Sequence, residues 1–287
     1  MPERPLTPSS AKPTEGRPAG KGGFAWQPLT PRGVAAFAGA SFKRLFLVQF
    51  IFASLLVGAV VWCFQQAWLP TITEAVRRLP AEGEIRAGRL NWRGDSPQRL
   101  AEGRFLALTV DLKNEGRLRS PAHVEVAFNQ TGFRIFSLFG FAQGSYPRGW
   151  RVAFNRAGLE AWWGAWKPAV SAIVITLLLA GLLLLWSTLA ALYCLPVWLA
   201  GFLVNRELGP GGSWRVSGAA LLPGGVFLTA AIFFYGLGAV DLIHLALALP
   251  LHIVVGWGYL WAGISCLPRH SKAASGKGNP FAGASPK

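Results

Sequence analysis

The sequence predicts an α-helical integral membrane protein with four transmembrane helices and an inserted, small, strand-rich α+β domain on the extracytoplasmic side. Three observations lead to this fold class. The 287 residues are 52% hydrophobic and only 14% charged, whereas globular domains average about 25% charged residues. Four stretches without Asp, Glu, Lys or Arg are long enough to cross about 30 Å of hydrocarbon, which takes roughly 20 helical residues. The segment between the first two stretches instead shows the alternation of strands.

The first stretch, residues 45–69, is predicted to be transmembrane helix 1. It is too long for the apolar region of a signal peptide and ends without a small-x-small cleavage site, so we expect it to stay as a signal anchor. Residues 1–44 would form a cytoplasmic tail, disordered over its Pro-, Gly- and Lys-rich first part. Thr30 and Pro31 suit an N-cap and a first helical position. A short helix on the inner membrane surface or a plain linker would fit the residues that follow.

The second half, residues 168–268, is predicted to be a bundle of three membrane helices with a cytoplasmic loop at 205–215. Its first uncharged stretch, 168–205, could be one long helix or a tight hairpin of two, although two spans and a turn need at least about 40 residues. We place residues 193–204 at the cytoplasmic interface, and the sequence does not decide whether they re-enter the membrane.

Basic residues at both ends of the membrane region predict the topology. Lys43 and Arg44 precede the first span, and Arg269 and Lys272 follow the last. The positive-inside rule places both ends in the cytoplasm, which requires an even number of crossings and favours four. The basic tail 269–287 is then cytoplasmic, and the chain is expected in the cell membrane as a multi-pass protein.

The extracytoplasmic domain is predicted over residues 70–167. Leu106, Leu108, Val110 and Leu112 alternate with other residues, so these leucines and the valine would line the core and Thr109 would face solvent. Turn signals such as "KNEG" and "NQTG" separate the elements. The predicted elements are a helix at 71–79 and strands at 84–92, 104–112, 123–128 and 150–154.

The stretch "FRIFSLFGF" places four phenylalanines within nine residues: Phe133, Phe136, Phe139 and Phe141. Three interpretations stay open: a wall of a ligand site, a loop that dips into the outer leaflet, or a strand and turn that close the small core.

Asp241, His244 and His252 are the ionisable residues in or beside the last two spans. Asp241 and His244 are three residues apart, so a helix places them on one face, and His252 is eight further on. Intramembrane ionisable groups are candidates for a proton relay or an ion pathway. The alternative is a histidine that bonds a neighbouring helix, with Asp241 in the outer turn.

Other site chemistry is not indicated. The three cysteines lie in or beside apolar segments without a metal-ligand spacing, and "GPGGS" lacks the GK[ST] of a phosphate loop. We expect no catalytic residues, no cofactor and no metal. The net charge of +15 comes from scattered residues without a nucleic-acid motif, so we expect no nucleic-acid partner.

Two segments carry a resemblance. "FLALTVDLKNEGRLRSPAHVEVAFNQTGFRI" is similar to the strand-Asp-turn-strand core of a family of uncharacterised bacterial membrane proteins, some labelled maltodextrin-utilisation proteins, with Asp111 in the matching place. The C-terminal helices resemble bacterial relatives of the Yip family, on Gly212, Ser213, Trp214 and Pro223. The resemblance implies an anchor helix, an extracytoplasmic domain and a helical bundle, and it implies no catalytic residues.

We therefore expect a non-enzymatic accessory, sensory or scaffold protein whose extracytoplasmic domain binds a partner or a small ligand. Its expected partners are the lipid bilayer and other membrane proteins or a second copy of the chain. The alternative is a small transporter or permease component that uses Asp241, His244 and His252.

Overall fold

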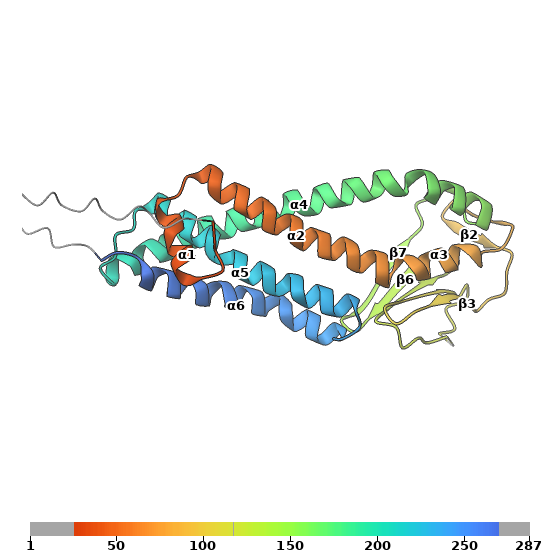
Figure 1. The fold of residues 1–287 in the computed structure, drawn as a ribbon. Helices are drawn as coiled ribbons and strands as arrows, with labels where there is room; N and C mark the ends of the chain where they lie inside the picture. The colour runs from red at the N-terminus through yellow and green to blue at the C-terminus, as the bar shows by residue number, and fades with distance from the viewer. Residues whose placement is uncertain (1–25, 117, 270–287) are drawn as a thin grey trace, which may run out of the picture.

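The computed structural model describes residues 26–116 and 118–269. Most of the predicted disordered start, residues 1–25, and nearly all of the basic tail lie outside these residues. A helical bundle forms most of the molecule, and a sheet region, residues 68–155, lies at one end of it (Figure 1). Both ends of the described chain lie at the opposite end, which we call the terminal end.

Four helical segments are long and apolar enough to cross a membrane, by length and composition: Phe42–Arg77, Arg156–Leu203, Pro210–Gly236 and Leu242–Cys266. The first consists of α2 (Phe42–Ala67) and the short α3 (Leu69–Arg77). α2 and α5 (Pro210–Gly236) run toward the sheet region, and α4 (Arg156–Leu203) and α6 (Leu242–Cys266) run back (Figure 1). The four helices confirm the helical part of the predicted fold class.

α4 is one continuous helix of 48 residues with Pro168 and Pro196 inside it. At 1.5 Å per residue it is about 72 Å long, more than twice the roughly 30 Å of a hydrocarbon core. The described chain therefore has no hairpin in this stretch, and residues 193–204 largely continue the helix. α4 begins at Arg156, inside the range assigned to the extracytoplasmic domain.

α5 is the central helix, packed against α2, α4 and α6. Small residues allow this: a Cβ on Gly224 would lie 2.1 Å from the carbonyl oxygen of His252, and one on Gly256 would lie 3.3 Å from that of Ala220. Backbones can approach this closely only where side chains are small. The exposed apolar side chains of α4 and α6 line the outside of the bundle, the arrangement expected of lipid-facing helices.

A short helix, α1 (Pro31–Ala36), begins as the sequence predicts, with Pro31 at its start and the Thr30 side chain accepting from Gly33 N. It does not lie free on a surface. Val34 is fully buried, and it contacts α6 where a Cβ on Gly263 would lie 3.0 Å from its side chain. The helix therefore closes the terminal end of the bundle.

The sheet region holds two sheets and α3, and confirms the predicted mixture of helix and strand. Antiparallel strands form the smaller sheet, in the order β2-β1-β8, and the larger sheet has the order β3-β4-β5-β6-β7 with β4 parallel to β5. The strands are β1 Gly83–Arg86, β2 Arg89–Trp92, β3 Gln98–Glu102, β4 Leu106–Val110, β5 Val124–Phe128, β6 Gly132–Ser137, β7 Gly140–Ser145 and β8 Arg151–Ala153.

One face of the larger sheet forms the core. Leu100, Leu106 and Val110 are at most 2% exposed, and side chains of α3 and the smaller sheet pack with residues of this face. The strand predicted over 84–92 is in fact the hairpin of β1 and β2. Its turn uses Ala87 and Gly88 at φ 52° and 76°, and the sequence gives no strong turn signal there.

The expectation that Thr109 faces solvent is wrong, because the opposite face of β4 is buried too. Thr109 is 1% exposed and Ala107 is fully buried. The segment that connects β4 to β5 folds back near this face, and the Thr109 hydroxyl donates to Glu125 Oε1 at 3.2 Å. A strand can alternate in polarity and still be covered on both faces when its polar side chains find partners.

Candidate functional site

Asp241 and His244 meet at the start of α6, where this helix leaves the sheet region. Asp241 is the N-cap: its carboxylate accepts from His244 N at 2.9 Å and lies 2.6 Å from His244 Nδ1. The backbone N–H of His244 is the main reason that the pKa of Asp241 lies below its usual value. Both side chains are well exposed. The pair therefore forms a solvent-exposed cap at the N-terminus of α6.

His252 lies apart from this pair. Its Nδ1 contacts the carbonyl oxygen of Leu249 in its own helix, and eight residues correspond to about 12 Å along α6. The structure thus brings two of the three predicted polar residues together and leaves the third two turns away. Within residues 26–116 and 118–269, no group of three or more His, Cys, Asp or Glu side chains could hold a metal ion.

The four phenylalanines of the β6–β7 hairpin take different places. Phe133 packs in the core of the sheet region. Phe136 and Phe141 are opposite each other on neighbouring strands, with ring centroids 6.4 Å apart. Phe139 stands at the tip of the hairpin and is 69% exposed, as is Phe141. Phe133 therefore fits the core interpretation, and the other three remain candidates for a ligand or lipid contact.

A cavity of about 580 Å³ lies between the polar face of the larger sheet and the start of α6, and its volume is in the range of small-molecule sites. Three separate parts of the chain form it. The sheet contributes Thr109, Glu125, Ala127, Arg134 and Phe136, the connection from β4 to β5 contributes Leu118 to His123, and α6 contributes Asp241, Leu242 and Ile243. Sequence reasoning found Asp241 and Phe136 but missed the cavity.

The carboxylates around the cavity already have partners. Asp111 accepts from the backbone N–H groups of Glu115 at 3.1 Å and Gly116 at 2.8 Å, which holds the turn after β4. Glu125 accepts from the Thr109 hydroxyl at 3.2 Å and from Ser120 N at 3.3 Å. These bonds fix the connecting segment onto the sheet.

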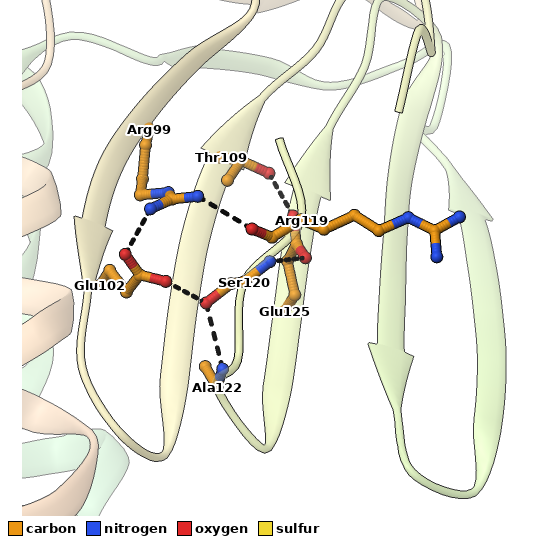
Figure 2. Close-up of polar contacts among 7 residues, drawn as sticks. All are labelled: Arg99, Glu102, Thr109, Arg119, Ser120, Ala122 and Glu125. Atoms are coloured by element: carbon orange, nitrogen blue, oxygen red, sulfur yellow. Dashed lines mark hydrogen bonds and ion pairs between the residues drawn. The ribbon is translucent and has the colours of Figure 1, made fainter. Parts of the chain in front are cut away.

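Figure 2 shows how the same network extends to β3. The Ser120 hydroxyl donates to Glu102, whose carboxylate also pairs with Arg99. Arg99 in turn donates from Nη2 to the carbonyl oxygen of Arg119 at 3.0 Å. Residues 119–122 are therefore held by charged hydrogen bonds, which are stronger than neutral ones, and one wall of the cavity is preorganised.

Two guanidinium groups at the cavity, those of Arg119 and Arg134, take no part in this network. The side chain of Arg119 extends away from the network (Figure 2). Arg134 lies on β6 opposite Ala127 and lines the same cavity. Among the residues that the structure describes, neither guanidinium has a hydrogen-bond or ion-pair partner. The cavity thus offers two cationic forks whose donors are available.

A cluster that we call the joint connects the sheet region to the helices. His123 Nδ1 lies 2.9 Å from the hydroxyl of Tyr235 near the end of α5, and the Phe105 ring meets Tyr235 edge-on at 5.0 Å. Arg104 donates to the carbonyl oxygen of Gly238 at 2.6 Å. Gly238 has φ 74°, a backbone conformation that favours glycine, and a Cβ there would displace the Arg104 guanidinium, whose Nη1 would lie 2.5 Å away.

His123 belongs both to the joint and to the cavity wall. Burial is the main cause that lowers its pKa below the ordinary 6.5, and the nearby Arg104 adds to this, against a smaller opposing effect of Asp241. The imidazole is therefore neutral in the folded protein at neutral pH. A ligand in the cavity would lie beside the residue that contacts α5.

Comparison of the chain with protein-family models, with curated proteins and with solved structures finds no significant match. The resemblance to the uncharacterised bacterial family and to Yip-like helices stays a prediction. The candidate site therefore rests on its own geometry.

Proposed function

We propose that this chain is a non-enzymatic membrane protein of accessory or sensory function, whose sheet region binds a small ligand in the cavity at the start of α6. The observation that carries the proposal is that one cavity has walls from both the sheet and a candidate membrane helix. His123 lines it and contacts Tyr235 of α5. Occupancy of the cavity can therefore change the contact between the sheet region and the bundle.

We also propose that the sheet region lies on the extracytoplasmic side and that both ends of the chain are cytoplasmic. Basic residues at the terminal end support this orientation. Arg206 donates to the carbonyl oxygen of Leu267, and Arg215 donates to that of Ala38, so both stay at the ends of the helices. The positive-inside rule places such residues in the cytoplasm.

The tip of the β6–β7 hairpin is proposed to contact the outer leaflet. Leu138 and Phe139 are 60% and 69% exposed. Leu138 lines the same cavity as Ile243 in the first turn of α6, so the tip lies close to the point where that helix would enter the bilayer. Exposed aromatic and aliphatic side chains are stable at such an interface.

The transporter alternative depends on Asp241, His244 and His252. It predicts uptake that is coupled to protons and is lost in His244→Ala and in His252→Ala. The structure supports the cavity more directly, because the Asp241–His244 pair is satisfied as a helix cap.

The ligand-binding function is tested by filling the cavity. Ala127 lines it, whereas Ala142 is exposed on β7 of the same sheet. Ala127→Trp places an indole in the cavity, and Ala142→Trp adds the same side chain outside it. The assay is the thermal unfolding temperature of the full-length protein in mild detergent, with the lipid fraction and the polar small-molecule fraction of the host cell.

We expect one fraction to stabilise the wild type and Ala142→Trp, since a ligand that binds only the folded state raises the unfolding temperature. Ala127→Trp should not respond. The proposal fails if no fraction stabilises the wild type more than Ala127→Trp.

A further inference from the structure

The lining of the cavity divides into a polar part and an apolar part. In the polar part, the guanidinium groups of Arg119 and Arg134 have no partner among the described residues. The carboxylates of the cavity accept hydrogen bonds from neighbouring residues. A guanidinium group presents a planar fork of donors that fits the oxygens of a phosphate. Asp111, Glu125 and Asp241 also line the cavity, so the two guanidinium groups are the donors that a phosphate would use, and it would bind on their side of the cavity.

The apolar part lies toward the bundle. Leu138 of the hairpin and Leu242 and Ile243 of α6 line the cavity, and Ile243 is 51% exposed. Leu247, one turn further along α6, is 60% exposed. An apolar surface thus continues from the cavity onto the outside of a candidate membrane helix.

From this combination we infer that the cavity binds the phosphate group of an amphiphilic ligand, with Arg119 and Arg134 on the phosphate and the apolar part of the ligand along Leu138 and Ile243. The inference rests on the proposed ligand-binding function and names its ligand class. The phosphate can come from a membrane lipid or from a soluble phosphate ester, and the continuous apolar surface favours the lipid.

The probe is phosphatidic acid with a photoreactive diazirine in its acyl chain, added to nanodiscs of phosphatidylcholine that contain the full-length protein. Mass spectrometry locates the crosslinked peptides. The test variant is Arg119→Gln with Arg134→Gln. The matched control is Arg86→Gln with Arg89→Gln, which removes the same charge from two exposed arginines of the smaller sheet.

We expect crosslinks on the peptides that contain Leu138 and Ile243, and a loss of about tenfold or more in the test variant, because it removes both charged donors that bind the phosphate. The control should keep wild-type labelling. Competition by glycerol 3-phosphate would assign the phosphate to a soluble ester, and failure of that competition would assign it to the lipid.

Equal labelling of the wild type and the test variant would overturn the inference, as would equal labelling by a diazirine diacylglycerol without phosphate. If this happens while a cell fraction still stabilises the wild type but not Ala127→Trp, only the ligand class is wrong. If neither protein responds to any fraction, the proposed function itself fails.

Discussion

Removal of the Tyr235 hydroxyl tests whether the joint holds the sheet region to the bundle. Tyr235 is 5% exposed, and its hydroxyl lies 2.9 Å from His123 Nδ1. Tyr235→Phe keeps the ring contact with Phe105 but leaves Nδ1 without this partner. A net hydrogen bond contributes about 0.5–1.5 kcal/mol, and an unpaired buried group costs about 1–3 kcal/mol. Because His123 is only partly buried, we expect Tyr235→Phe to destabilise the joint by about 1 kcal/mol.

The assay is amide hydrogen exchange in nanodiscs. The backbone N–H groups of His123 and Val124 donate to the carbonyl oxygens of Arg104 and Phe105, each at 3.1 Å, so they report on the joint. A loss of 1 kcal/mol lowers their protection roughly fivefold, since 1.4 kcal/mol corresponds to a factor of ten.

The control for this prediction is Tyr259→Phe, which removes a hydroxyl that donates to Leu29 O at 3.1 Å, just before the start of α1. It should leave protection at His123 and Val124 unchanged. Unchanged protection in Tyr235→Phe, or the same loss in both variants, would refute the assignment of the joint.

Three further predictions address the pH dependence, the helix packing and the hairpin. The pKa of His123 lies below 6.5 in the folded protein, so the opened joint binds more protons than the closed one. The stability of the joint should therefore fall as the pH drops below about 6.5. Amide hydrogen exchange at pH 5 and pH 7.5, corrected for intrinsic rates, should show this loss in the wild type and not in His123→Asn. Gly224→Ala should destabilise the bundle by about 1–3 kcal/mol through overpacking. Gly258→Ala, with nothing within 4 Å of its Cβ, should be neutral or stabilising by up to about 1 kcal/mol. Thermal unfolding in detergent distinguishes the two variants, and equal effects would contradict the close packing of α5. A fluorophore on Phe139→Cys should be quenched by spin-labelled lipids, and one on the exposed Gln143→Cys should not; quenching of neither would place the tip in water or against a protein.

The helices could be predicted because each depends on a local property of the chain. A run of about 20 residues without charge is sufficient to indicate a span, and Thr30 followed by Pro31 indicates the start of α1 because capping involves only neighbours. The burial of Leu106 and Val110 followed from their spacing for the same reason. The burial of Thr109 could not be predicted from its spacing, because it depends on Glu125, which comes from another strand.

The cavity could not be predicted because its walls come from segments that are distant in the sequence. Arg134 on β6 and Ile243 on α6 lie more than a hundred residues apart and share the cavity only after the sheet region packs at the end of the bundle. The phenylalanine-rich stretch shows the same limit. Phe133 and Phe139 look alike in the sequence, but the pleat of β6 turns one into the core and the hairpin turn exposes the other.

The most direct test of ligand binding in the cavity is an experimental density map of the full-length protein in lipid nanodiscs, determined by electron cryomicroscopy. We predict an elongated density that begins between Arg119 and Arg134 and continues along Leu138 and Ile243 toward the lipid, with the His123–Tyr235 contact intact. A sheet region that lies apart from the start of α6, so that no common cavity exists, would contradict it.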